Sequence, residues 1–261
     1  QVTAPLGKRR TGLEAGMTYC VGILVKEGLT MIADTRTNAG LDNVSQYKKL
    51  HIFERPGDRM VAVATAGNLA ITQAVLSLLN EGIEDKETGR SETIWTQPSM
   101  FKTAQLVGRA IREVYRIDGE ALEQSNAGFE VTMLVGGQVA KGRLRLFMIY
   151  RQGNFIEATE DTPFLQIGEH KYGKPILDRA VTYRSSLQNA LKLGLISMDS
   201  TMRSNLGVGM PIDLVTVKRD AIAHDILHRI EPGEPYFHDL RERWSAALRA
   251  AYRAIPIPPY K

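Results

Sequence analysis

Met17-Thr18-Tyr19-Cys20-Val21-Gly22 is the first of four short motifs that decide the fold, and three others follow it along the chain. These are Ala33-Asp34-Thr35-Arg36, Lys48-Lys49-Leu50 and Ala66-Gly67-Asn68. The first two flank a predicted hairpin, because their apolar runs are separated by the turn sequence Lys26-Glu27-Gly28. The motifs therefore place a Thr, an Asp, a Lys and a Gly at the ends of predicted strands.

Blocks of strands alternate with pairs of helices along the rest of the chain. The expected strands are Tyr19–Val25, Leu29–Asp34, Leu50–Glu54, Met60–Thr65, Phe129–Val135, Arg143–Tyr150, Phe155–Ala158, Ile212–Val217 and Ala221–Ile230. The expected helices follow Asn68 and Pro98 and then span Tyr172–Val181, Ser186–Met202 and Asp239–Ala254, while Thr35–Gln46 is expected to be a loop. This order predicts an α+β fold, a four-layer αββα sandwich of two stacked antiparallel sheets.

Length and composition are those of an ordinary globular protein of 261 residues, with 43% hydrophobic and 24% charged residues. We expect a single domain over residues 17–261. Residues 1–16 are expected to be an extension, either a misassigned start, a tag or a propeptide, and they lack the apolar core of a secretory signal. No apolar run approaches the roughly 20 residues of a membrane span. A single cysteine argues against disulfides and favours a cytoplasmic location.

The net charge of +4 and the pI of about 9.1 raise the question of nucleic-acid binding. The basic residues do not form a track, since Arg241 and Arg243 alternate with Asp239 and Glu242 near the C-terminus. That pattern is more typical of a solvated or subunit-facing helix. We therefore expect neither a nucleic-acid nor a membrane partner.

The residue types at the four motifs are those of an amide hydrolase with an N-terminal nucleophile. Removal of the residues before Thr18 would give that residue a free α-amine beside its hydroxyl, and an unperturbed α-amine titrates at about 7.7–8.0. The amine can serve as base while the hydroxyl attacks a carbonyl carbon. Lys49 is expected to favour the deprotonated hydroxyl by charge, Asp34 to orient Lys49, and the Gly67 N–H to stabilise the oxyanion.

Other candidate chemistries are weaker. Cys20 lies inside an apolar strand, which favours a buried structural thiol over a nucleophile. His224 and His228 are four residues apart, but they lie in a predicted strand without an intervening Glu, so they are a poor zinc signal. We expect no metal and no cofactor.

The motifs resemble those of the proteasome β-subunit and HslV families, in which an Asp follows the nucleophilic Thr by sixteen positions, as Asp34 follows Thr18. The chain is most similar to the bacterial proteasome-related family called Anbu. That resemblance rests on the four motifs, on Ser197–Thr201 and Pro211–Leu214, and on Leu240-Arg241-x-x-Trp244. It implies self-assembly into a ring or an open helical oligomer, with peptides or unfolded proteins as substrate and an ATPase as a possible, unidentified partner.

The resemblance also implies four supporting site residues. Arg36 occupies a position that is often basic or polar in proteasome β subunits. Glu169 stands where proteasomes place a Ser beside the Thr amine. Asp199 matches a later Asp of the family, and Ser200 could replace the Ser that should follow it, since Met202 occupies that position. The carboxylate of Glu169 could retune the amine or accompany an unusual substrate.

The sequence thus predicts a threonine-type peptidase that acts through an acyl-enzyme. Two alternatives remain open. The first is a non-catalytic, proteasome-like assembly subunit, favoured if Thr18 never becomes the first residue or if Glu169 blocks its amine. The second is a small-molecule amidase or transferase of the N-terminal-nucleophile class.

Overall fold

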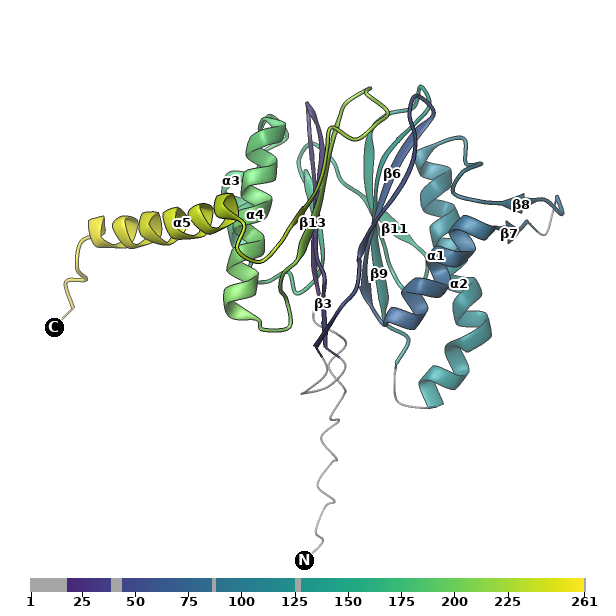
Figure 1. Ribbon diagram of the computed structural model, residues 1–261, viewed down its shortest axis with the longest axis horizontal. Coiled ribbons are helices and arrows are strands. Elements are labelled where there is room, and N and C mark those ends of the chain that lie inside the picture. Colours follow the sequence, from purple (N-terminus) through teal and green to yellow (C-terminus); the bar gives the residue numbers. More distant parts are fainter. Residues whose placement is uncertain (1–17, 39–43, 86–87, 125–127, 261) are drawn as a thin grey trace, which may run out of the picture.

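The structure is a computed structural model that describes residues 18–38, 44–85, 88–124 and 128–260. Two five-stranded antiparallel sheets stack face to face, and a pair of helices covers the outer face of each sheet (Figure 1). The expected αββα sandwich is therefore confirmed. The expected extension at residues 1–16 lies outside the described residues, as does Met17.

The first sheet has the strand order β12-β1-β2-β13-β14. Its strands span Tyr19–Val25 (β1), Gly28–Asp34 (β2), Phe164–Gly168 (β12), Ile212–Lys218 (β13) and Ile226–Ile230 (β14). Every residue of β1 and β2 is buried, because the second sheet covers one face and helices cover the other. These two central strands carry Thr18 and Asp34 at neighbouring ends, since Cys20 pairs with Ala33.

The second sheet has the order β11-β10-β9-β6-β5. Its strands span Leu50–Arg55 (β5), Arg59–Gly67 (β6), Val131–Val139 (β9), Arg145–Ile149 (β10) and Phe155–Glu157 (β11). Apolar side chains such as Met31, Leu134 and Leu146 fill the space between the sheets. This core holds the beginning of β1 against the end of β6.

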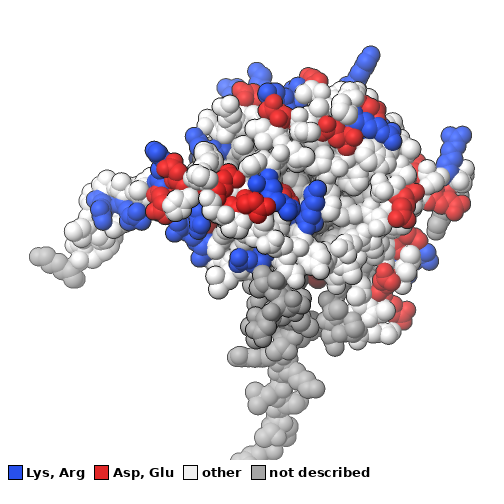
Figure 2. Space-filling model, viewed as in Figure 1, with Lys and Arg blue, Asp and Glu red and all other residues white. Residues whose placement is uncertain are grey.

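Helices α1 (Leu69–Glu81) and α2 (Met100–Gln124) cover the second sheet, and α3 (Lys174–Ala180) and α4 (Leu187–Ser204) cover the first. Helix α5 (Pro235–Ala254) differs from the others, because its outer half extends away from the sandwich (Figure 1). Only Phe237 and Leu240 of α5 are buried. On the face shown in Figure 2, basic and acidic side chains are interspersed, including over the base of this helix.

Several expected elements differ in the structure, and β9 runs to Val139 instead of ending at Val135. The region expected to be a loop carries a small ribbon of β3 (Arg36–Asn38) and β4 (Val44–Gln46), and β12 was not expected at all. The last strand begins at Ile226 instead of Ala221, because Asp220 and Ile222 adopt positive φ angles in a turn. Helix α5 begins at Pro235, four residues earlier than expected, since proline fits the first helical turn.

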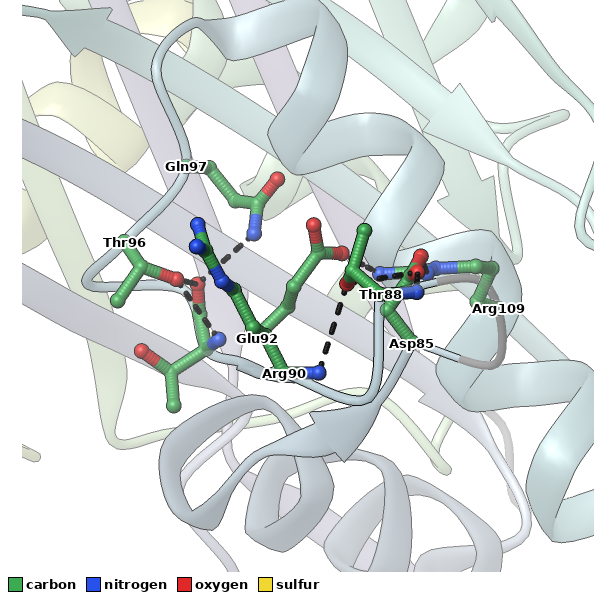
Figure 3. Close-up of polar contacts among 8 residues, drawn as sticks. Asp85, Thr88, Arg90, Glu92, Thr96, Gln97 and Arg109 are labelled. Atoms are coloured by element: carbon green, nitrogen blue, oxygen red, sulfur yellow. Dashed lines mark hydrogen bonds and ion pairs between the residues drawn. The ribbon is translucent and has the colours of Figure 1, made fainter.

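The connection between α1 and α2 forms a second small ribbon, β7 (Ile83–Glu84) and β8 (Ser91–Glu92). Figure 3 shows that Arg109 of α2 points at the two carboxylates of this ribbon, Asp85 and Glu92. The Asp85 carboxylate also accepts the backbone N–H and the hydroxyl of Thr88, both at 2.9 Å. Side chains thus tie the projecting ribbon to the helix layer.

No helix within the described residues has the length and apolarity that a bilayer crossing requires.

Candidate active site

Thr18 lies immediately before β1 and is buried, with 4% of its surface exposed. Its carbonyl oxygen accepts a hydrogen bond of 2.7 Å from the N–H of Glu169, at the end of β12. Gly168 approaches so closely that a Cβ there would lie 1.9 Å from the same oxygen, and its φ is +78°. A glycine is therefore needed at position 168 for β12 to close over the Thr18 backbone.

Asp34 ends β2 beside Thr18, and its side chain is fully buried. Its Oδ1 accepts hydrogen bonds from the N–H of Tyr19 at 3.1 Å and from the Nζ of Lys49 at 2.8 Å. Its Oδ2 accepts one from the N–H of Gly209 at 3.2 Å. Burial raises the pKa of the Asp34 carboxyl, and the Lys49 ammonium and the two backbone donors oppose that shift.

Lys49 approaches from the start of β5 and is itself 5% exposed. Its ammonium donates to the carbonyl of Arg36 at 2.5 Å as well as to Asp34. Its own carbonyl accepts the N–H of Thr65 at 3.0 Å, which fixes the start of β5 against β6. The ammonium is thus held by one carboxylate and one carbonyl in a site that excludes most water.

Gly67 ends β6 at the turn into α1, where its φ is +115°. A Cβ at this position would lie 2.2 Å from the carbonyl oxygen of Glu130, so the turn requires glycine. Asn68 caps α1 by accepting the N–H groups of Ala70 and Ile71 at 2.9 and 3.4 Å. The expected sharp strand-to-helix turn is present.

The turn lies at the same end of the sandwich as Thr18. The thiol of Cys20 on β1 donates to the carbonyl of Thr65 on β6 across the two sheets, at 3.7 Å. Cys20 is fully buried, and this burial raises the pKa of its thiol. The thiol therefore has the environment of a packing residue and not of a nucleophile.

The supporting residues divide into two groups. Arg36 and Glu169 lie at the site. The guanidinium of Arg36 donates to the carbonyl of Leu206 at 2.8 Å and packs over Gly209, and its own carbonyl binds Lys49. Glu169 binds the Thr18 carbonyl through its N–H.

Asp199 and Ser200 lie on helix α4, and the structure does not join Asp199 to the Thr18 group. The carboxylate of Asp199 is fully buried and pairs instead with Arg241 of α5 at 2.6 Å and with Arg203 at 3.2 Å. The pair with Arg241 fastens α5 to α4, and the pair with Arg203 lies within α4. Ser200 follows on the same helix and is partly buried.

Sequence reasoning missed Asn205, which lies just beyond the end of α4. Its amide donates to the Glu169 carboxylate at 2.9 Å, and Lys171 approaches the other carboxylate oxygen at 3.4 Å. Four residues further on, Gly209 donates to Asp34. One short segment, Asn205–Gly209, therefore holds the carboxylates of both Asp34 and Glu169. Across the described parts of the chain, no group of three or more His, Cys, Asp or Glu side chains is arranged to hold a metal ion.

This geometry accompanies clear similarity to known proteins. The family of proteasome subunits matches residues 14–217. The chain belongs to the proteasome family and, within it, to the Anbu proteins. Anbu from Hyphomicrobium sp. strain MC1 is 48% identical, with a TM-score of 0.84 over 93% of this chain and 100% of that chain.

Two further Anbu structures agree with this assignment. Anbu (ancestral beta-subunit) from Yersinia bercovieri is 43% identical, with a TM-score of 0.84 over 94% of this chain and 100% of that chain. A structure described as the helical assembly of the Anbu complex from Pseudomonas aeruginosa is also 43% identical, with a TM-score of 0.85 over 93% of this chain and 98% of that chain. The comparison with curated proteins gave no match.

Proposed function

We propose that this Anbu protein is a threonine-type amide hydrolase whose nucleophile is the hydroxyl of Thr18, exposed as the first residue after the preceding bond is cut. The observation that carries the proposal is the buried pair of Asp34 and Lys49, in which Asp34 holds the backbone N–H of Tyr19 and the Lys49 ammonium on one carboxylate oxygen. This arrangement fixes an ammonium beside the start of β1, next to Thr18.

In this proposal each residue has one role. The α-amine of Thr18 accepts the hydroxyl proton, and the hydroxyl oxygen attacks the substrate carbonyl. The Lys49 ammonium favours the deprotonated hydroxyl by charge, and Asp34 orients that ammonium. The Gly67 N–H stabilises the oxyanion, the leaving amine takes the proton from the α-amine, and water then hydrolyses the acyl-threonine ester.

The charge of Glu169 favours a second candidate function, in which the substrate is an amide other than an ordinary peptide. Its carboxylate is held by Asn205 and Lys171 one residue away from the glycine that covers Thr18. A negative charge near the amine stabilises its ammonium form, so a smaller fraction of the amine is free to accept a proton near neutral pH. A small-molecule amidase or transferase remains the second candidate function for this reason.

Self-assembly belongs to the same proposal. The outer half of α5 exposes Leu248 and Tyr252 at 50% and 60%, on the stripe that buries Phe237 and Leu240 nearer the body. A helix that carries its apolar stripe past its own domain is expected to contact another copy. The helical assembly described for the Anbu complex of Pseudomonas aeruginosa supports the same expectation.

The test is acylation of natively expressed protein by a β-lactone, followed by intact and fragment mass measurement. We expect one adduct, on a chain that begins at Thr18, and no adduct in the Thr18→Ala variant. Hydrolysis is then assayed on unfolded polypeptide and on small amides, which separates a peptidase from an amidase. A chain that never begins at Thr18, or full turnover by the variant, would instead support a non-catalytic subunit or another nucleophile.

A further inference from the structure

The free edge of β12 borders a groove of about 710 Å³ that ends beside the candidate active site. Its walls combine apolar and aromatic side chains of both sheets, among them Met148, Tyr150 and Phe164, with Val181 at the end of α3. Gly168, which covers the Thr18 carbonyl, lines the same groove. Among the described residues no strand pairs with this edge, so the groove joins an open strand edge to the backbone of the candidate nucleophile.

The hydrogen bonds of β12 show which of its backbone groups face this groove. The N–H of Glu169 binds the Thr18 carbonyl, and the N–H of Leu24 binds the Pro163 carbonyl, each at 2.7 Å. In an antiparallel pair these bonds recur at every second residue. The intervening Phe164, Gln166 and Gly168 therefore direct their N–H and C=O groups away from β1, and the Gly168 carbonyl already accepts the N–H of His170 at 3.0 Å. Phe164 and Gln166, two residues apart, thus direct their backbone N–H and C=O groups toward the groove.

The segment after α5 has a matching pattern. Ile255-Pro256-Ile257-Pro258 alternates isoleucine with proline, and Ile255 has an extended backbone with φ −78° and ψ 128°. Prolines at alternate positions remove the N–H groups from one edge of a strand only. The other edge keeps the C=O of Ile255 and both backbone groups of Ile257, and the Ile255 N–H is used to end α5 on the Tyr252 carbonyl at 3.2 Å.

The apolar side chains of the same segment are exposed to solvent. Ile255, Ile257 and Tyr260 are exposed at 69%, 91% and 89%. Helix α5 carries them away from the sandwich (Figure 1), which favours a second copy of the chain as the surface that covers them. The charges also agree, because basic Arg253 precedes the segment and acidic Asp161 lines the groove, where Lys174 and Asp178 pair with each other at 2.6 Å.

We propose that Ile255–Pro258 of one copy adds as a strand to the free edge of β12 in a second copy and fills this groove. Ile257 pairs with the outward backbone groups of β12, and the isoleucine side chains pack against Met148 and Tyr150. The backbone of the two prolines faces away from β12, and because proline has no N–H, that outer edge cannot pair with a further strand. The added strand would stiffen the turn that holds Thr18, so each site would be completed by a neighbour. The proposal rests on the proposed self-assembly and names its contact.

The test is site-directed disulfide formation between two differently tagged chains. One chain carries Ile257→Cys and the other Tyr150→Cys, and the native Cys20 is buried and does not compete. We expect a heterodisulfide between the two tags, identified by fragment mass, in roughly tenfold excess over the product with a Thr88→Cys chain, because docking raises the effective concentration of the thiols. Equal yields with Tyr150→Cys and Thr88→Cys, or no heterodisulfide, would overturn the proposal.

A matched pair of variants tests the backbone contact itself. Gln166→Pro removes an N–H that faces the groove, whereas Gln166→Ala removes only the side-chain bond to the Tyr19 hydroxyl, which both variants lose. We expect the cross-link to fall severalfold in the proline variant alone, with equal circular dichroism in both. Equal cross-linking in the two variants would refute the strand pairing. Light scattering separates the proposals, because a monomer contradicts self-assembly and an oligomer without the cross-link contradicts only this contact.

Discussion

The Nζ of Lys49 lies 2.8 Å from Oδ1 of Asp34, and 7% and 0% of the two side chains are exposed. A buried ion pair of this kind contributes little net stability, since both charges lose their hydration. Removing one partner is nevertheless strongly destabilising, because the other charge is left buried without compensation. The pair is therefore better explained as a means of holding an ammonium beside Thr18 than as a source of stability. It also makes the site sensitive to the loss of either charge.

The first prediction concerns this coupling. Lys49→Met leaves the Asp34 carboxylate buried with only the N–H groups of Tyr19 and Gly209, and it should destabilise the protein by roughly 3–5 kcal/mol. Asp34→Asn removes the negative charge instead and leaves the Lys49 ammonium without its carboxylate. The double variant should lose clearly less than the sum of the single variants in urea unfolding. Additive losses would show that the two charges do not depend on each other.

The second prediction concerns the close approach of β12 to Thr18. Gly168→Ala places a Cβ 1.9 Å from the Thr18 carbonyl oxygen at a positive φ. The matched control is Gly233→Ala, because Gly233 also has a positive φ, +91°, but nothing lies within 4 Å of its Cβ position. The control should lose only the roughly 1–2 kcal/mol of left-handed strain, and Gly168→Ala should lose more and slow β-lactone acylation. Equal losses of stability in calorimetry would contradict the observed contact.

The third prediction concerns Cys20. Burial raises the pKa of its thiol above the ordinary value, and only the thiolate reacts with alkylating reagents. Native protein should therefore resist iodoacetamide across pH 7 to 9 and keep its β-lactone acylation, whereas the urea-unfolded chain should be alkylated at once. If iodoacetamide alkylated Cys20 in the native protein and β-lactone acylation fell in proportion, the nucleophile would be the Cys20 thiol instead of Thr18.

The sequence predicted the layers of the fold. It also placed Thr18, Asp34, Lys49 and Gly67 at strand ends, where the structure has them, because each stands next to an apolar run or in a glycine turn. It missed β12, since Phe164-Leu165-Gln166-Ile167-Gly168 is short and interrupted by a polar residue whose amide binds the Tyr19 hydroxyl at 2.5 Å. The identity of the neighbouring strand depends on contacts far along the chain, which local patterns do not encode.

Asn205 was missed for a related reason. Its contact with Glu169 joins residues 36 positions apart, and an Asn just after a helix is ordinarily explained by local capping. Asp199 illustrates the converse. Its place in the sequence favoured the site, but a fully buried carboxylate must find cations, and Arg241 and Arg203 are the ones that reach it.

The last prediction concerns the charge of Glu169 and rests on the proposed role of Thr18. Glu169→Gln preserves the shape and the backbone N–H that binds the Thr18 carbonyl at 2.7 Å, but it removes the negative charge. A lost anion disfavours the ammonium form of a nearby amine, so the acid limb of the pH–rate profile for β-lactone acylation should move to lower pH. Lys171→Gln removes the cation 3.4 Å from the same carboxylate and should move that limb the other way. Asn205→Ala keeps both charges, so it should alter the rate at all pH values without moving the limb. Identical profiles for the two charge variants would show that Glu169 acts on Thr18 only through its backbone.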